Sequence, residues 1–450
     1  MTGLARGASI TFAARLAALV IGIASSVVVA RALGPAGKGE YALIILIPAL
    51  FQLAGGLGLD QAVVYLVARR RGEARAITFT LAASSAGLGL LLLGGYAALS
   101  LLRPYTRYLE AAAVDPPLVW ILIALLPVTL ATQSLLSGIL ALERYRDYNL
   151  ATLVPPIVNL ALLLALVVLL RLGVAGAVAA SGGASLIGLA GAGVLFFAAA
   201  PSGQVRPLPG LVREALSYGW RAHAASLAWF VHYRADMFLV GYMAGPAALG
   251  FYATAVGLAE KLYLAPSAIG TVLFPRVAAA EGSEQRNVTP QASRYALWLT
   301  IGLSVLVAAL ARPVIGGLYG ADFLPSVPLL WLLLPGMISL AVGRLVSADL
   351  NGRGLPGSVA RVNASATVLN LVLNLWWLPI WGLAGAAVAT SVSYTTTTVL
   401  LVQRYRRASG ARWAELLLFR RSDWADLSRV AAWLGRPAAS GDMPSSDRGV

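Results

Sequence analysis

Long apolar stretches alternate with short polar ones along almost the whole chain, and this pattern predicts membrane-spanning helices. About twelve stretches each hold roughly 20 or more mostly apolar residues, and a helix of that length crosses the ~30 Å hydrocarbon layer of a bilayer. We therefore expect an all-α membrane protein with about 12 transmembrane helices. The predicted spans are residues 8–30, 41–66, 78–102, 118–141, 149–171, 174–200, 215–242, 248–275, 292–312, 325–349, 359–378 and 382–403.

The composition agrees with this prediction and excludes several classes of function. Of the 450 residues, 59% are hydrophobic and 12% are charged, whereas a soluble protein is closer to half apolar and a quarter charged. The chain has no cysteine and only two histidines. Disulfides, iron–sulfur clusters, thiolate zinc sites, cysteine nucleophiles and multi-histidine metal centres are therefore excluded, and no cofactor is expected.

The net charge of +15 comes mainly from arginines in the polar loops. Arginine-rich and arginine-poor loops alternate, and the clusters at Arg69–Arg71 and Arg404–Arg407 fall on the same side of the predicted membrane. Because lysine and arginine accumulate in cytoplasmic loops, we expect a multi-pass protein of the cell (inner) membrane with both termini in the cytoplasm. An even number of spans agrees with this orientation, and no nucleic-acid partner is needed to explain the charge.

The tail after residue 410 has a different pattern from the spans. Apolar residues between Trp413 and Leu434 recur every three or four positions, with arginines among them. That periodicity is typical of an amphipathic helix lying in the headgroup layer. We expect a cytoplasmic interfacial helix over residues 411–435 and a disordered tail over residues 436–450.

An internal repeat divides the membrane region into two halves. Residues 33–42 and 244–253 agree at six of ten positions, at an offset of 211, and further matches occur at or near that offset. The halves, residues 1–205 and 206–410, are predicted to be two six-helix lobes related by a pseudo-twofold axis along the membrane normal. Transporters built from such parallel repeats hold their substrate between the halves and rock one half against the other.

The repeat motif also carries a family resemblance. Residues 29–42 (VARALGPAGKGEYA) followed by Gly56–Asp60, together with Tyr233–Phe238 and the Gly245-Pro246 pair, resemble the polysaccharide-exporting flippases of the multidrug/oligosaccharidyl-lipid/polysaccharide exporter superfamily. The resemblance covers about residues 5–405. It implies that the chain flips an undecaprenyl-diphosphate-linked oligosaccharide from the cytoplasmic to the outer leaflet for cell-surface polysaccharide synthesis. We further expect a monomer in the lipid bilayer, and glycosyltransferases or a polymerase of the same pathway are candidate partners. Exopolysaccharide and O-antigen are candidate products, and the identity of the glycan stays open.

Several basic side chains fall inside predicted spans, where a charge costs about 2.5–3.5 kcal/mol and needs a reason. The substrate-binding candidates are Arg15, Arg221, His223, Arg234 and Lys261. A cationic cavity suits an anionic diphosphate, and arginine offers forked donors to phosphate oxygens. His223 and Arg234 are eleven residues apart, or three helical turns, so they share a helix face. The alternative is that Arg15 and Arg221 extend to the headgroups.

Two carboxylates are candidates for binding a coupling ion. Glu260 falls near the middle of a predicted span, and Asp236 lies two residues from Arg234. The adjacent Lys261 offers a simpler role for Glu260, namely neutralisation, and Asp236 with Arg234 could equally be a structural pair. The energy source, whether protons, sodium or the membrane potential, stays open.

Glycines and prolines mark weak points inside the spans, where a helix can bend. Gly55, Gly58, Asp60 and Pro266 are the structural or hinge candidates, and Asp60 is interpreted as a cap or turn residue at the glycine-rich break. Bending at such points suits alternating access, provided that packing partners or water satisfy the freed backbone groups.

Four other functions compete with glycan export. A drug or cation antiporter of the same superfamily would want buried carboxylates, whereas the first predicted span offers Arg15 instead. A lipid II flippase resembles a fourteen-helix plan rather than twelve. A membrane-embedded glycan transferase would need an acid–base constellation, for which His232 with Asp236 is the only candidate in the sequence. A transport-inactive scaffold for glycan assembly is the fourth alternative.

Overall fold

The computed structural model describes residues 2–201, 208, 210–264, 266–267 and 282–419. The expected lobe boundary at residues 205–206 falls outside this range, as does the tail from residue 420 onward. Of the predicted interfacial helix, the described residues include only its start, in which α14 (Trp413–Leu417) is helical.

The first half of the chain folds into one helical bundle. Its long first helix, α1 (Thr2–Gly56), is interrupted by non-helical backbone at Gly34. The bundle contains α1, α2 (Leu59–Arg69), η1 (Arg71–Glu73), α3 (Ala74–Ser100), α4 (Arg103–Ala111), α5 (Pro116–Ile123), α6 (Leu126–Ala141), α7 (Tyr145–Leu163), η2 (Leu164–Leu169) and α8 (Gly173–Ala199).

The second half forms a similar bundle around two further interrupted helices. Non-helical backbone occurs at Gly245 within α9 and at Gly382 within α13. The described elements are α9 (Leu211–Ala259), η3 (Glu260–Tyr263), α11 (Gly282–Val314), η4 (Ile315–Tyr319), η5 (Ala321–Phe323), α12 (Ser326–Gly352), α13 (Pro356–Ser409) and α14.

The interrupted helices account for twelve membrane crossings. In the described part of the chain, 9 helical stretches are long and apolar enough to cross a membrane. Three of them, Ala13–Gly56, Phe230–Tyr263 and Pro356–Ser409, contain the breaks at Gly34, Gly245 and Gly382. At 1.5 Å per residue, α1, α9 and α13 are each more than twice as long as a bilayer core is thick. Counting each of the three twice gives the twelve spans expected from the sequence.

Two of the expected spans are interrupted differently from the prediction. The span 41–66 stops at Gly56, and α2 starts at Leu59 after left-handed backbone at Leu57 and Gly58. The span 118–141 is divided into α5 and α6, with a proline at the start of α6. Proline lacks the N–H that a continuous helix would use, so a helix readily begins there.

The backbone repeats itself at the offset found in the sequence. Gly34 (φ 68°, ψ −176°) and Gly245 (φ 81°, ψ 178°) adopt nearly the same backbone conformation, with a positive φ. The turns after α6 and α12 repeat in the same way, since Glu143 has φ 60° and Gly354 has φ 77°. The two halves therefore share their turns as well as their residue pattern.

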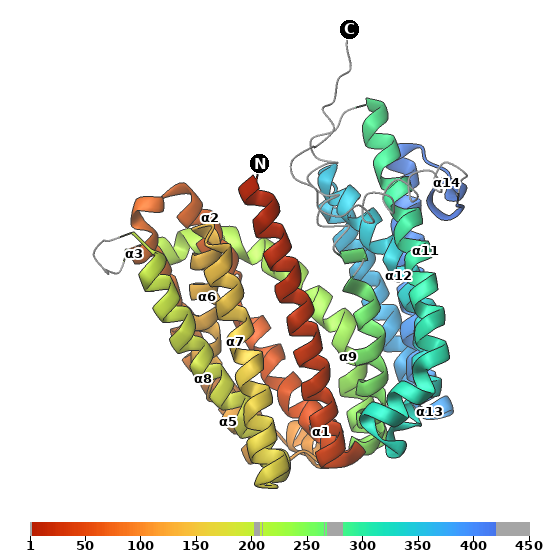
Figure 1. Cartoon of the computed structure of the whole chain (residues 1–450), viewed down its shortest axis with the longest axis horizontal. Helices are drawn as coiled ribbons and strands as arrows, with labels where there is room; N and C mark the ends of the chain where they lie inside the picture. Colours follow the sequence, from red (N-terminus) through yellow and green to blue (C-terminus); the bar gives the residue numbers. More distant parts are fainter. Residues whose placement is uncertain (1, 202–207, 209, 265, 268–281, 420–450) are drawn as a thin grey trace, which may run out of the picture.

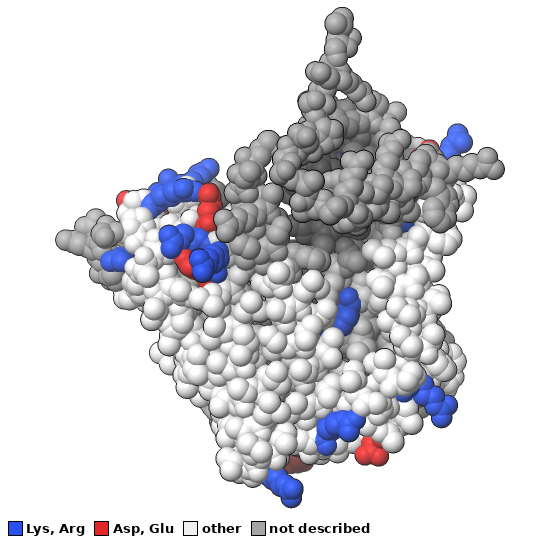
Figure 2. All heavy atoms as spheres, viewed as in Figure 1, with Lys and Arg blue, Asp and Glu red and all other residues white. Residues whose placement is uncertain are grey.

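The two bundles meet at one end of the molecule and diverge toward the other (Figure 1). We call the end at which α1 begins and α13 ends the terminal end, and the opposite end the closed end. Figure 2 shows charged side chains near both ends of the visible face and a nearly uncharged band between them. This band is the surface expected to face lipid tails, so the chain is a multi-pass membrane protein.

At the closed end, the two copies of the repeat motif pack against each other. A Cβ added to Gly39 would lie 1.8 Å from the carbonyl oxygen of Pro246, and one added to Gly250 would lie 2.0 Å from that of Pro35. These four residues exchange places under the offset of 211. The contact is therefore reciprocal about the pseudo-twofold axis, and it requires residues without a side chain.

At the terminal end, the start of α9 is held by the first bundle. Arg70 forms a bidentate ion pair with Glu214 (2.9 and 3.1 Å), and the rings of Tyr65 and Tyr218 stack 4.1 Å apart. The start of α9 thus packs on the first bundle at this end, and α9 also packs with α12 and α13 of the second bundle.

Candidate functional site

A cleft between the two bundles contains two adjoining cavities of about 460 and 560 Å³. The first is lined by α1, α7, α9 and η3, and the second by α1, α9, η3 and α12. Both cavities are lined by Arg234 and Glu260, which lie at their common boundary.

Arg234 and Glu260 form a forked ion pair across the break in α9. The guanidinium donates to both carboxylate oxygens at 2.8 and 3.1 Å, and the side chains are 30% and 26% exposed. Such bidentate pairs are among the stronger polar contacts because both partners are charged and their planes match. The pair fixes the orientation of Arg234 while leaving part of it open to the cleft.

Basic side chains outnumber acidic ones in the cleft. Arg15 and Lys261 line the second cavity together with Arg234, and Glu260 is the carboxylate there. Arg15 and Lys261 are exposed, and neither forms an ion pair or hydrogen bond with another described residue. Three of the five predicted substrate-binding residues are thus brought to one cavity, and two of them have no ion-pair or hydrogen-bond partner among the described residues.

Lys38 is a cleft residue that the sequence analysis did not propose. It lines the first cavity and is only 6% exposed. Its ammonium donates to Ser26 Oγ at 3.1 Å and lies 4.4 Å from the centre of the Tyr319 ring. Lys38 belongs to the repeat motif, but the motif reads as a loop in the sequence because its glycines and proline interrupt the apolar pattern.

Asp236 is buried inside the second bundle rather than in the cleft. Its carboxylate accepts hydrogen bonds from Tyr252 (2.6 Å), Thr390 (3.1 Å) and the backbone N–H of Met237 (2.8 Å). The side chain is 3% exposed. These donors join α9 to α13, so Asp236 lies in a polar connection within one lobe.

The acid–base pair that a membrane-embedded transferase would need is not formed in the described residues. Both ring nitrogens of His232 are buried without a hydrogen-bond partner in the described residues, so His232 and Asp236 do not form an acid–base pair. Asp349, at the end of the span that contains Arg344, is paired with Arg353 and accepts a hydrogen bond from Thr289. The Arg344 guanidinium lies 5.8 Å from the centre of the Tyr263 ring.

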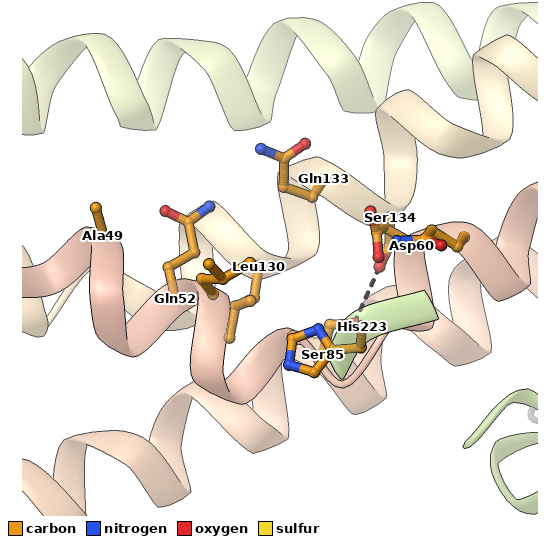
Figure 3. Close-up of a pocket in the computed structure, with 11 residues that line it drawn as sticks. Ala49, Gln52, Asp60, Ser85, Leu130, Gln133, Ser134 and His223 are labelled. Carbon is orange, nitrogen blue, oxygen red and sulfur yellow. Dashed lines mark hydrogen bonds between the residues drawn. The ribbon is translucent and has the colours of Figure 1, made fainter. Parts of the chain in front are cut away.

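His223 and Asp60 line a separate cavity of about 340 Å³ in the first bundle (Figure 3). His223 Nε2 is 3.3 Å from the carbonyl oxygen of Ala54. Asp60 lies in the first turn of α2 but makes no capping hydrogen bond. His223 and Arg234 therefore line different cavities, although their spacing of three helical turns predicts that they share a helix face. Arg221 lies in α9, where the structure describes its backbone only.

The hinge candidates occupy close contacts between helices. A Cβ on Gly55 would lie 2.1 Å from the Leu92 side chain, and one on Gly58 would lie 2.3 Å from the carbonyl oxygen of Gly219. Pro266 is buried just after η3. Gly58 has a φ of +72° and faces backbone, so glycine is required there, whereas at Gly55 a movement of the Leu92 side chain could relieve the contact.

Comparison with known families decides the class of the chain. The family model "Polysaccharide biosynthesis protein" matches residues 4–281, which include both copies of the repeat motif and most of the cleft. The chain belongs to this family. The resemblance inferred from the motifs is thus confirmed. A second family model, "Lipid II flippase MurJ", matches residues 255–434 of this polysaccharide biosynthesis protein.

Curated relatives of the chain include two proteins of Haloferax volcanii. "Probable flippase AglR" is 29% identical over 206 residues, which is 42% of this chain and 41% of the relative. "Probable low-salt glycan biosynthesis flippase Agl15" is 25% identical over 192 residues, with the same coverage of 42% and 41%. The chain thus covers about two fifths of the length of each of these relatives.

Solved structures share the fold of this polysaccharide biosynthesis protein. "Inward-facing conformation of a multidrug resistance MATE family transporter of the MOP superfamily" has a TM-score of 0.71 at 14% identity, over 87% of this chain and 94% of that chain. "Lipid II flippase MurJ, inward closed conformation" has a TM-score of 0.67 at 16% identity, over 95% and 96%. The predicted all-α, two-lobed transporter fold is confirmed.

Proposed function

We propose that this polysaccharide biosynthesis protein is a flippase rather than an enzyme. It moves an undecaprenyl-diphosphate-linked oligosaccharide from the cytoplasmic to the outer leaflet by alternating access through the cleft. The flippase names of the two Haloferax volcanii relatives support the transport class. The diphosphate and the undecaprenyl carrier are our extension from the family resemblance and the charge of the cleft.

The cationic lining of the cleft is the observation that carries the proposal. Arg15, Arg234 and Lys261 line one cavity against the single carboxylate of Glu260. A diphosphate entering the cleft leaves water, and in that low-dielectric space each contact with a basic group strengthens. Arg15 and Lys261 supply donors that no other described residue uses, while Glu260 holds Arg234 in place. An anionic head group fits this arrangement, and a cationic drug does not.

The conformation fits the first step of the cycle, in which substrate enters from the cytoplasm. The two bundles diverge toward the terminal end (Figure 1), where the arginine-rich loops favour a cytoplasmic location. The similarity to a transporter in an inward-facing conformation (TM-score 0.71) is greater than that to one in an outward-facing conformation (TM-score 0.56). We infer that the closed end faces outward and that both termini are cytoplasmic.

We assign coupling to an ion gradient to Asp236 rather than to Glu260. Glu260 has both carboxylate oxygens bonded to Arg234, so a second cation there would compete with a forked ion pair. The hydrogen-bond donors that hold Asp236 carry no charge, so a proton or a sodium ion there would not compete with an ion pair. Its bonds join α9 to α13, so a change there acts on two long helices.

A lipid II flippase is the second candidate function. The match of the lipid II flippase family model to residues 255–434 favours it. The two candidates differ in the glycan rather than in the diphosphate, and the twelve spans here differ from the fourteen-helix plan that those flippases resemble. Complementation in a strain lacking its lipid II flippase, and separately in one lacking its polysaccharide flippase, distinguishes them.

The test is complementation with Arg15→Gln and Arg234→Gln, normalised to the amount of membrane-inserted protein. Each replacement removes a positive charge but keeps a hydrogen-bonding side chain, so we expect export to fall at least tenfold in the double variant. Arg15→Lys should retain part of the activity because it keeps the charge but loses the planar fork.

Arg312→Gln is the matched control. Arg312 is exposed and lies outside the cleft cavities, so the same change in charge there should leave export unchanged. Full export by the double variant at equal protein level would remove the cationic cleft from the mechanism. A defect that follows only a loss of inserted protein would assign both arginines to folding.

A further inference from the structure

Seven of the eleven residues that line the cavity in the first bundle are polar, and none of the seven is a lysine or an arginine. Gln52, Asp60, Gln61 and Gln133 are partly buried or exposed, and none of them forms a hydrogen bond or ion pair with another described residue. Figure 3 shows Gln52 from α1 and Gln133 from α6 on either side of the same space, with Asp60 at its far end. Four free polar side chains in one membrane lobe need a reason, because polar groups at such positions are costly.

The remaining polar groups of this cavity are fixed in place. Ser85 of α3 and Ser134 of α6 are hydrogen-bonded to each other at 3.0 Å and are 3% and 1% exposed. His223, which is 8% exposed, closes the cavity from α9. Five helices thus contribute to a preformed site of about 340 Å³, at the lower end of the volumes of about 300–1,000 Å³ that hold small ligands.

The chemistry of these groups selects a neutral ligand rich in hydroxyls. Each primary amide offers two donors and one acceptor, and each sugar hydroxyl can both donate and accept. A bare cation would bind only the oxygens and would be repelled by the N–H groups of three glutamines. A phosphate would be repelled by the carboxylate of Asp60. A saccharide uses both kinds of group, so it is the ligand class that leaves the fewest of them unsatisfied.

The cavity joins the cationic cleft along one helix. Ala49 lines both this cavity and the first cavity of the cleft. Lys38, Ala42, Ala49 and Gln52 recur at intervals of three, four or seven residues, so they follow one face of α1. From Lys38 to Gln52 this face runs for about 21 Å at 1.5 Å per residue. A ligand with a charged part and a neutral polar part can therefore occupy both spaces at once.

We propose that the polar cavity between Gln52, Asp60, Gln61, Gln133 and His223 is the saccharide subsite, which binds the glycan while the cationic cleft binds the diphosphate. This inference rests on the proposed function and assigns the glycan and the diphosphate to different parts of the protein. Selectivity among glycans then depends on the first bundle, and the charge that drives binding depends on residues shared by both bundles.

The experiment compares two lipids on the purified full-length chain in detergent. One is the lipid-linked oligosaccharide fraction extracted from cells in which the chain is native, and the other is the same lipid diphosphate with its glycan removed. Binding is followed by the fluorescence of the 11 tryptophans. We expect the wild type to bind the glycan-bearing lipid at least tenfold more tightly than the bare lipid, since several hydrogen bonds are added.

Gln52→Met with Gln133→Met keeps the length of both side chains and removes their hydrogen-bonding groups. This double variant should bind the glycan-bearing lipid about tenfold more weakly than the wild type and the bare lipid equally well. Unchanged binding of the bare lipid also shows that the variant is folded. Gln403→Met, the same change at an exposed position of α13, should leave both affinities unchanged.

Arg234→Gln separates the two sites by weakening the binding of both lipids. Equal affinity of the wild type for the two lipids would overturn the saccharide subsite and leave the cationic cleft intact. A double glutamine variant that still prefers the glycan-bearing lipid by the wild-type factor would overturn it as well. Failure of the wild type to bind either lipid would instead contradict the proposed function, and with it this inference.

Discussion

Adding one methyl group at the closed end should open it. Gly39 and Gly250 sit at the reciprocal contact of the two repeat motifs, where an added Cβ would lie 1.8 Å from the Pro246 oxygen and 2.0 Å from the Pro35 oxygen. Ordinary contact begins at 3.4 Å, so the backbones must separate by about 1.5 Å. A rotamer change cannot relieve the overlap, because a Cβ and a carbonyl oxygen both have positions fixed by the backbone.

The size of the effect follows from the cost of overpacking. An inserted methyl group in a packed contact costs about 1–3 kcal/mol. Only the state in which the closed end is intact contains this contact, so only that state is destabilised. The ratio of closed to open molecules should therefore fall about 5- to 150-fold. Helix propensity acts in the opposite direction, because alanine is about 0.5–1 kcal/mol better than glycine inside a helix. General helix destabilisation is thus no explanation for a defect.

The assay uses the absence of native cysteine. Ala42→Cys places a single thiol in the first cavity of the cleft, one helical turn from Gly39. A membrane-impermeant maleimide added from the side of the closed end should label it slowly in the wild type and faster in the Gly39→Ala and Gly250→Ala backgrounds. Gly94→Ala in α3 is the control, since a Cβ there meets nothing within 4 Å.

Two results would refute this reasoning. Labelling of Ala42→Cys at the wild-type rate in both glycine variants would show that the contact does not seal the closed end. Equal acceleration by Gly94→Ala would show that any added methyl group loosens the protein, and the reciprocal contact would then have no special role.

Two further predictions concern stability and topology. Tyr252→Phe removes the 2.6 Å hydrogen bond to buried Asp236, so it should lower the free energy of unfolding by about 1–3 kcal/mol. The control Tyr242→Phe keeps an exposed ring stacked on Tyr108 and should leave the free energy of unfolding unchanged. Equal thermal unfolding midpoints for the two variants would contradict the role of Tyr252. Two single-cysteine variants test the topology: Gly72→Cys in η1 and Arg107→Cys in α4, both at exposed positions. They should react with an impermeant thiol reagent from opposite sides of the membrane. In intact cells, only Arg107→Cys should be labelled. Labelling of Gly72→Cys in intact cells would reverse the orientation.

The spans and their repetition could be predicted because they depend on composition over long windows. A run of apolar residues crosses a bilayer whatever it packs against, so the twelve crossings follow from the chain alone. The breaks were harder to place. Gly34 and Gly245 read as loops between spans, whereas the structure keeps the chain helical on both sides of each glycine. Glycine permits a positive φ, but the sequence does not say how soon the helix resumes.

The candidate site could be predicted in part, for a reason of geometry. Single charges in apolar surroundings are visible in a sequence, which is why Arg15, Arg234 and Lys261 were candidates. Their partners are not visible. Glu260 reaches Arg234 across 26 residues because α9 is interrupted at Gly245 and its second part returns beside the first. Lys38 was missed for the same reason, since its place in the cleft depends on that kind of break.

The polar cavity was missed because its members are uncharged and far apart in the chain. Gln52 and Gln133 come from α1 and α6, and nothing in the sequence spacing brings them together. Asp60 drew attention as a turn residue, and its carboxylate makes no capping bond. Glutamine and serine in a span cost less than a charge and leave a weaker signal, so only the packing of five helices makes the group recognisable.

Translocation in a purified system tests the central claim most directly. The full chain is reconstituted in liposomes that carry a fluorescent undecaprenyl-diphosphate-linked oligosaccharide, and the fraction reaching the opposite leaflet is measured with a membrane-impermeant quencher. We expect translocation by the wild type, loss of it in Arg15→Gln with Arg234→Gln, and retention in Arg312→Gln. Accumulation of a lipophilic cation instead, with no movement of the diphosphate-linked glycan, would contradict the account and identify an antiporter.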